Sequence, residues 1–206
     1  MNKILEKLDG KTSEEILTIY NEIDNIPVDI VKVAKEIGIK LGSIDFTELE
    51  KEEGFKKTVE EKGSILGAVF TSGENVNIFY NSRLYDDDEL NNLSDADKKD
   101  KLLRRQRFTI AHEIAHCCLH AGTMQDYHIE YRTEQKDYTD EKERRANIFA
   151  GELLIPKKII ITLCAMLEDK ISISFFADLF KVSRHVMEAR LEYLQEIGEI
   201  GKIQFI

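Results

Sequence analysis

The residues most able to do chemistry are two histidines and a glutamate in the run HEIAH, residues 112–116. On an α-helix, residues four apart differ by about 40° around the axis and by about 6 Å along it. His112 and His116 therefore project from one face and can bind one metal ion together. Glu113 lies on the adjacent stripe, where its carboxylate can take a proton from a water molecule but is poorly placed to be a ligand. This spacing predicts a zinc site that activates water, as hydrolysis of an amide bond requires.

The alternative interpretation of this run is an ordinary pair of histidines on a helix surface. The neighbouring residues argue against it, because they make the helix apolar almost all round and predict that it is buried. Buried histidines need polar partners or a metal. The apolar neighbours are Ile110, Ala111, Ile114, Ala115, Cys118 and Leu119.

A catalytic zinc site with one open position needs a third protein ligand, and a second predicted helix offers one. In ERRANIFAGELL, the residues Glu143, Ala146, Asn147 and Ala150 share a face by i, i+3, i+4, i+7 spacing. Small alanines would let this helix cross the first closely and bring the Glu143 carboxylate to the metal. Asn147 would lie one turn further, able to hydrogen-bond a ligand or nearby backbone. Spacing alone leaves open that Glu143 is one solvated charge among several.

Three further histidine and tyrosine positions need a separate interpretation. His120 continues the i, i+4 series but lies about 12 Å along the axis from His112, so a straight helix cannot bring it to the same ion. It is expected to support the site from the helix end. His128 and Tyr131 follow in a polar segment and could stabilise the oxyanion that forms during hydrolysis. An ordinary polar loop is the alternative for each of them.

The elements expected to position these residues are strands early in the chain and helices late, which predicts an α+β fold. Ser13 is a possible helix cap, Pro27 opens the second helix, and Gly38 ends it. A hairpin is expected around Gly73. The expected helices span residues 13–24, 27–37, 104–121, 140–154, 157–168, 172–180 and 184–197, and the strands 39–46, 64–71 and 75–82. Residues 47–63 are expected to form loop or a short helix, 84–101 a solvated acidic excursion, and 122–139 a polar loop.

Composition restricts the function classes. The chain has 206 residues, with 39 Asp and Glu against 29 Lys and Arg, and this acidic balance repels phosphate backbones and anionic membranes. The sequence has neither an apolar run long enough to span a bilayer nor an apolar signal core. Cys117 and Cys118 are adjacent and unlikely partners for each other, and the third cysteine, Cys164, lies in an apolar helical run. We expect reduced core thiols and a cytoplasmic protein that binds neither nucleic acid nor membrane.

Taken together, these motifs resemble the ImmA/IrrE family of metallopeptidases. The matching pieces run in the family's order from Pro27 to about Leu194: IPVDIVKVAKEIGIKL, IFYNS, RFTIAHEIAHCCLH, ERRANIFAGELLIP and ISFFADLFKVSRHVMEARLEYL. The combination of the third and fourth pieces is far more specific than either alone. The acidic stretch at 86–100 looks longer than is usual in the family, and the sensor domain of some larger relatives is missing.

The resemblance implies a zincin-like metallopeptidase domain over residues 1–156 and a helical, helix-turn-helix-like lobe over 157–206 packed on it. It implies one zinc ion on His112, His116 and Glu143, with Glu113 as the general base. It also implies a protein substrate, namely a helix-turn-helix transcriptional repressor of a phage, mobile element or stress regulon. A different class of function stays open, in which a metal-stabilised, non-catalytic regulator sequesters the repressor.

The last matching piece has the cadence of a helix-turn-helix, which makes a DNA-binding regulator a third hypothesis. Its charge does not favour DNA, because residues 157–197 hold as many acidic as basic residues and the would-be recognition helix includes Glu188 and Glu192. We expect this lobe to pack on the catalytic part or to dock the repressor. The sequence does not indicate an oligomeric state.

Overall fold

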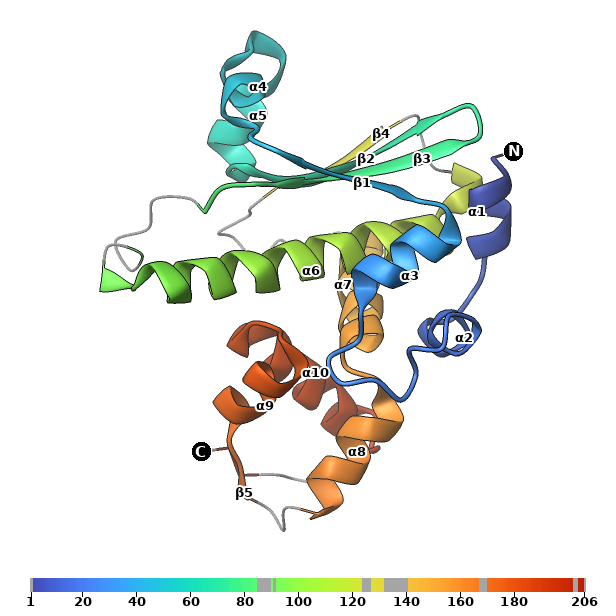
Figure 1. Cartoon of the computed structure of the whole chain (residues 1–206), viewed down its shortest axis with the longest axis vertical. Coiled ribbons are helices and arrows are strands. Elements are labelled where there is room, and N and C mark those ends of the chain that lie inside the picture. Colours follow the sequence, from blue (N-terminus) through green and yellow to red (C-terminus); the bar gives the residue numbers. More distant parts are fainter. Residues whose placement is uncertain are drawn as a thin grey trace.

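A long helix, α6, runs beneath a four-stranded sheet, and other helices pack around these two elements (Figure 1). A computed structural model describes residues 2–84, 90, 92–123, 127–131, 141–166, 170–201 and 204–205. The α+β class predicted from the sequence is confirmed. In chain order the elements are α1 (Lys3–Leu8), α2 (Ser13–Ile19), α3 (Ile30–Ile37), β1 (Lys40–Ile44), α4 (Thr47–Lys51), α5 (Glu53–Lys62), β2 (Ile65–Ser72), β3 (Asn75–Asn81), α6 (Asp95–Leu119), a 3₁₀ turn (Ala121–Thr123), β4 (Tyr127–Tyr131), α7 (Glu141–Leu154), α8 (Lys157–Met166), β5 (Lys170–Ile171), α9 (Ile173–Phe180), α10 (Arg184–Glu196) and β6 (Gln204–Phe205).

Helices lie on both faces of the sheet (Figure 1). The strand order is β1-β3-β2-β4, with β1 parallel to β3 and with β2 antiparallel to both β3 and β4. Val69 and Ile78 point into the main core, which also contains buried residues of α3, α6 and α7. Phe46 and Ala68 belong to a smaller core on the opposite face, where side chains of α4 and α5 pack. Side chains therefore alternate between two apolar environments along β2 and β3.

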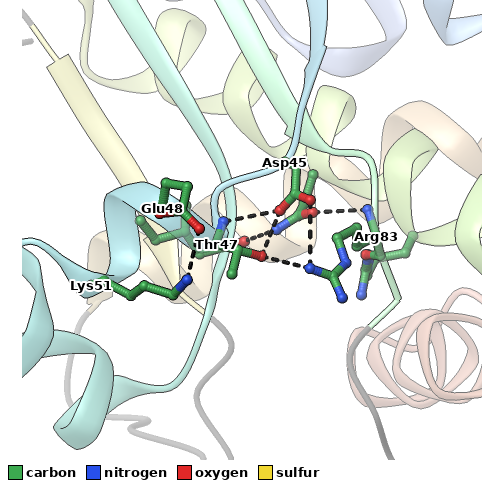
Figure 2. A network of polar contacts seen from close by, with 8 residues as sticks. Asp45, Thr47, Glu48, Lys51 and Arg83 are labelled. Atoms are coloured by element: carbon green, nitrogen blue, oxygen red, sulfur yellow. Dashed lines mark hydrogen bonds and ion pairs between the residues drawn. The ribbon is translucent and has the colours of Figure 1, made fainter.

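The end of β1 and the segment after β3 are joined by polar contacts that also begin α4 (Figure 2). Asp45 Oδ1 accepts hydrogen bonds from the Thr47 amide at 3.0 Å and from the Thr47 hydroxyl at 2.6 Å. Arg83 Nη1 donates to Thr47 Oγ1 at 2.8 Å and lies 3.5 Å from Asp45 Oδ2. These groups are about half exposed, so the contacts position the connection from sheet to α4 more than they stabilise it.

The start of the chain is predicted well where local signals agree. The hairpin forms as predicted, since β2 and β3 are separated by a turn at Gly73. Gly38 ends α3 in the left-handed conformation, with φ of 104°, which glycine adopts without steric cost. Helix α3 begins later than predicted, at Ile30, because the Asp29 side chain rather than Pro27 caps it.

Three boundaries or assignments differ in part from the prediction. Helix α2 is capped by Thr12, not Ser13, since Thr12 and Glu15 form a reciprocal capping box, and the helix ends at Ile19. Residues 47–63, expected as loop or a short helix, form two helices, α4 and α5. The expected loop at 122–139 contains strand β4. Its remaining residues, 124–126 and 132–139, lie outside the described residues.

Helix α6 begins nine residues before the predicted start at Arg104. The Ser94 hydroxyl accepts a hydrogen bond from the Asp97 amide at 3.2 Å and so caps the helix. Asp95 and Asp97 lie in the first turn, where negative side chains interact favourably with the helix dipole and stabilise the helix. The prediction of a solvated excursion is therefore wrong from residue 95 onward. Residues 85–89 and 91 of that segment lie outside the described residues. None of the helices in the described ranges is long and apolar enough to cross a membrane.

The helices predicted after residue 156 are present as α8, α9 and α10. Their buried residues, including Phe176 and Leu191, belong to the same core as those of α6 and α7. Two arginines of α6 bind the chain where α9 ends. Arg104 Nη1 donates to the Val182 carbonyl at 2.8 Å, and Arg107 Nε donates to the Lys181 carbonyl at 3.1 Å. The turn between α9 and α10 is thus attached to the helix that carries the HEIAH motif.

A buried carboxylate, Glu22, fixes the connection between α2 and α3. Its side chain is 2% exposed and accepts hydrogen bonds from Lys32 Nζ at 2.8 Å, Asn25 Nδ2 at 2.9 Å and the Asp29 amide at 2.9 Å. Burial raises the pKa of Glu22, but these hydrogen bonds outweigh it and hold that pKa below its usual value. Because the carboxylate is stabilised in the folded state, its contribution is present at neutral pH and is lost as the pH falls through the lowered pKa.

We expect Glu22→Ala to lower the free energy of unfolding at pH 7 by about 2 kcal/mol, since hydrogen bonds to a charged group are lost. The difference from wild type should shrink as the pH falls below the usual glutamate pKa of about 4, and it should be lost once the pH passes the lowered pKa of Glu22 in the folded protein. Urea unfolding at neutral and at acidic pH measures this. Glu48→Ala is the control, because Glu48 is exposed in its ion pair with Lys51 and should matter little. A pH-independent difference would contradict the assignment.

Candidate metal centre

The motif residues lie in the buried half of α6. His112 is 1% exposed, Glu113 is 0% exposed and His116 is 4% exposed. The preceding and following residues on α6, from Ile110 to Cys118, are also buried, as their apolar character predicts. Polar side chains at such depth require partners, so the positions of their donor and acceptor atoms decide what the site can do.

Three nitrogen and oxygen donors converge at this place. His112 Nε2 and His116 Nε2 are 2.9 Å apart. Glu143 Oε2 lies 3.2 Å from His112 Nε2, and Glu143 Oε1 lies 3.4 Å from His116 Nε2. In the part of the chain that the structure describes, one donor atom from each of these residues lies within 4.8 Å of the others.

This donor set fits a zinc ion. Ligands at 2.0–2.2 Å in a tetrahedron lie about 3.4 Å from one another, close to the separations found here. The chemistry agrees as well, since two imidazoles and one carboxylate are ligands that zinc accepts in catalytic sites. Three protein ligands leave a fourth position for water or substrate.

Glu143 reaches the histidines because α7 crosses α6 closely. Figure 1 shows α7 running beneath α6 at a steep angle, and the two helices are in contact. Ala146 and Ala150 follow Glu143 on the same face of α7, and both are fully buried. Their small side chains allow the two backbones to approach, as the spacing predicted. Burial raises the pKa of Glu143, but hydrogen bonds with the surrounding histidines outweigh it and hold that pKa well below its usual range.

His128 enters the site from the sheet. It lies opposite Val69 in the antiparallel β2–β4 pair, and residues opposite each other point to the same face. Since Val69 points into the main core, His128 points towards α6. Its Nδ1 lies 3.2 Å from Glu113 Oε2, and its Nε2 lies 3.2 Å from Glu143 Oε1. Burial lowers the pKa of His128, but the hydrogen bonds with Glu113 and Glu143 outweigh it and raise that pKa to about 10.

The link through His128 is the feature of the site that spacing did not predict. The sequence indicated His128 as a candidate oxyanion donor in a polar loop, not as a strand residue that contacts both glutamates. Two signals were present, namely the alternation of polar and apolar residues in YHIEY and its aromatic and β-branched content, which favour a strand. Five residues are too few to define a period of two, so the sequence fits a loop equally well.

Two further candidate site residues, His120 and Asn147, do not belong to the cluster of three donors. His120 caps the C-terminus of α6, with its ring centroid 5.6 Å from that of His116, and it is not among the three clustered donors. Asn147 is exposed on α7. Tyr131 belongs to β4, but its side chain lies outside the described residues.

The cysteines are placed as the sequence predicted for core thiols. Cys117 and Cys118 are fully buried, and Cys164 is partly buried against the main core. Burial raises the pKa of Cys118 to about 12, and it raises the pKa of Cys117 well above its usual value. Thiols that stay protonated are poor metal ligands, so the histidines and Glu143 are the better candidates to hold a metal.

The close crossing of the two helices can be tested by overfilling it. Ala146→Leu should lower the free energy of unfolding by about 1–3 kcal/mol and weaken zinc binding, because α7 must move away from α6. Gly151→Ala on the same helix is the control, since an added Cβ there would meet its nearest atom, Arg190 Cδ, at an ordinary 3.9 Å. That change should stabilise the helix by about 0.5–1 kcal/mol. Thermal unfolding and zinc titration check both; unchanged zinc affinity in Ala146→Leu would contradict the crossing argument.

Comparison with known proteins agrees with the geometry. A peptidase family described as the IrrE N-terminal-like domain matches residues 98–192. No curated protein matches the chain significantly. The matched residues include both helices that carry the three clustered donors, strand β4, and the helices up to α10. Residues 98–192, which include the three clustered donors, are therefore similar to the IrrE N-terminal-like domain of a peptidase family, and this similarity supports a metallopeptidase.

Proposed function

We propose that the protein is a zinc-dependent endopeptidase that cleaves a protein partner, with His112, His116 and Glu143 as the metal ligands and Glu113 as the general base. One observation carries the proposal: three donors with zinc-like separations lie beside a carboxylate that is 0% exposed. A buried carboxylate next to a metal site, rather than in it, is what proton transfer to and from a water molecule requires.

A zinc ion at this site would lower the pKa of bound water from 15.7 to about 7 and polarise the scissile carbonyl. Glu113 takes a proton from the attacking water as its oxygen bonds to the carbonyl carbon. Glu113 then gives that proton to the amide nitrogen as the carbon–nitrogen bond breaks, which leaves a carboxyl group and an amine. His112, His116 and Glu143 hold their positions because α6 and α7 are fixed by the main core.

The edge strand supplies a place for an extended peptide. In the described part of the chain, β4 pairs with β2 on one side and lies at the edge of the sheet order. Its His128 points to the donors, so a peptide paired with the open edge would pass the site. Backbone pairing with a sheet edge binds peptides with little dependence on sequence, which suits an unfolded or flexible segment of a protein.

The partner we propose is a helix-turn-helix transcriptional repressor in the cytoplasm, as the resemblance to the ImmA/IrrE family implies. The second candidate function, sequestration of a repressor without cleavage, uses the same partner but does not need Glu113.

The structure disfavours the third hypothesis, direct DNA reading by α9 and α10. A recognition helix contacts bases with its N-terminal residues. Here Ser183 and Arg184 at that end line a pocket with three aspartates and two further basic residues, Lys101 and Arg104, so this region has no excess of positive charge to attract phosphate. Arg104 further attaches the adjoining Val182 carbonyl to α6. A gel shift at low salt tests this directly.

The proposed function is tested by incubating zinc-loaded and chelator-treated protein with repressors encoded beside its gene and by identifying fragments by mass spectrometry. We expect discrete cleavage by the zinc-loaded protein alone. Zinc-loaded protein that binds a repressor tightly and leaves it intact would support sequestration instead. Protein that takes up no zinc at micromolar concentration would exclude the hydrolase.

A further inference from the structure

His128 bridges the two carboxylates of the site. Its Nδ1 contacts Glu113 and its Nε2 contacts Glu143, each at 3.2 Å, although the two glutamates come from different helices. Because an imidazole ring carries one nitrogen on each side, a single side chain can contact both carboxylates at once. The imidazole ring therefore sets how far apart and in which orientation the two carboxylates lie.

We infer that His128 is a positioning residue, which orients Glu113 for proton transfer through Nδ1 and supports the metal ligand Glu143 through Nε2. This inference rests on the proposed function. It differs from the role of oxyanion donor that the sequence suggested for His128, because an oxyanion donor needs a ring nitrogen directed at the substrate.

The two oxygens of Glu113 show what this positioning achieves. Oε2 is held by His128, whereas Oε1 is buried and has no hydrogen-bond partner in the ranges that the structure describes. A buried acceptor without a partner is costly and is found where a site expects a further group. With Oε2 fixed, Oε1 is the atom left to accept the proton of the attacking water.

At Glu143, the contact with His128 resembles the hydrogen bonds that commonly orient metal ligands. Such outer contacts fix the direction of the ligating atom, and their loss typically costs 10–100-fold in metal affinity or activity. Glu143 needs this support because its side chain is still 37% exposed, whereas the side chains of His112 and His116 are 2% and 6% exposed. The ring centroid of His128 lies 4.1 Å from that of His116, so the ring also packs against the ligand set.

The two roles can be separated by two variants. The amide nitrogen of asparagine takes the place of Nδ1, and that of glutamine takes the place of Nε2. His128→Asn should therefore keep the contact with Glu113 and lose that with Glu143, whereas His128→Gln should do the reverse. His128→Phe keeps the ring and loses both contacts. His185→Asn and His185→Gln are matched controls, because His185 is exposed on α10.

Three measurements are made on each variant: zinc affinity by competition with a chromophoric chelator, the visible spectrum of the Co²⁺-substituted protein, and kcat and KM for cleavage. We expect His128→Asn to bind zinc about 10-fold more weakly with an altered cobalt spectrum, and to lose less in kcat than His128→Gln. His128→Gln should keep the metal properties and lose about 10–100-fold in kcat, and His128→Phe should show both losses.

Metal affinity and cobalt spectra that are unchanged in all three variants, with a lower kcat, would overturn the positioning role and assign His128 to the substrate. Wild-type values for every readout would overturn it as well. Both results leave the proposed function intact if wild type binds zinc and cleaves. A wild-type protein without zinc binding would instead remove the proposed function, and this inference with it.

Discussion

Glu113→Gln is expected to bind one zinc ion with the affinity of wild type and to cleave its substrate about 10²–10⁴-fold more slowly, the usual contribution of a positioned general base. Glutamine has nearly the same shape, so the fully buried site should keep its packing. Its amide cannot take a proton from water. The loss should appear in kcat, because Glu113 acts on the reacting atoms rather than on substrate binding.

Comparing Glu113→Gln with wild type also separates the two candidate functions, cleavage and sequestration, which share a repressor as partner. Glu192→Gln, an exposed position on α10, is the matched control and should cleave like wild type. In a reporter strain, an endopeptidase predicts that Glu113→Gln leaves the repressor intact and transcription off. Sequestration predicts that the same variant still relieves repression. Full cleavage by Glu113→Gln would contradict the assignment of the base.

What could be predicted from the sequence is what depends on spacing within one helix. His112 and His116 are brought together by the 3.6-residue period alone, and the burial of α6 follows from its apolar neighbours. The position of Glu143 required a further inference, because Glu143 lies on a second helix. Ala146 and Ala150 supported that inference, since small buried side chains on the same face allow the two helices to cross closely. The ImmA/IrrE resemblance rested on the same segments, and the family match over 98–192 confirms it.

What could not be predicted depends on pairing between distant segments. His128 reaches the site only because β4 pairs with β2, about sixty residues earlier, and because Val69 fixes which face His128 shares. A short strand without a flanking turn signal carries too little local information for this. The early start of α6 was missed for another reason. Ser94 was a readable cap, but the acidic run around it favoured a solvated excursion.

His116→Ala is expected to abolish stoichiometric zinc binding and, with it, cleavage. Removing one of three protein ligands leaves His112 and Glu143, and two ligands do not hold zinc against a chelator at neutral pH. Zinc should also stop stabilising the protein. At free zinc about 1,000-fold above Kd, binding stabilises a folded protein by about 4 kcal/mol, so wild type should unfold at a higher temperature with zinc than with chelator.

The thermal comparison is what makes this prediction specific to the metal. His116 is buried, so its loss also leaves a cavity and lowers stability in the absence of zinc. The informative quantity is therefore the shift in unfolding temperature on adding zinc, which should be several degrees in wild type and close to zero in His116→Ala. His185→Ala, at an exposed position, should keep the full shift. A His116→Ala protein that retained the wild-type shift, and one zinc per chain by elemental mass spectrometry, would place the metal elsewhere. Loss of both would place the ion on α6. The crossing of α6 and α7, which brings Glu143 to the histidines, would then be the step that builds the catalytic site.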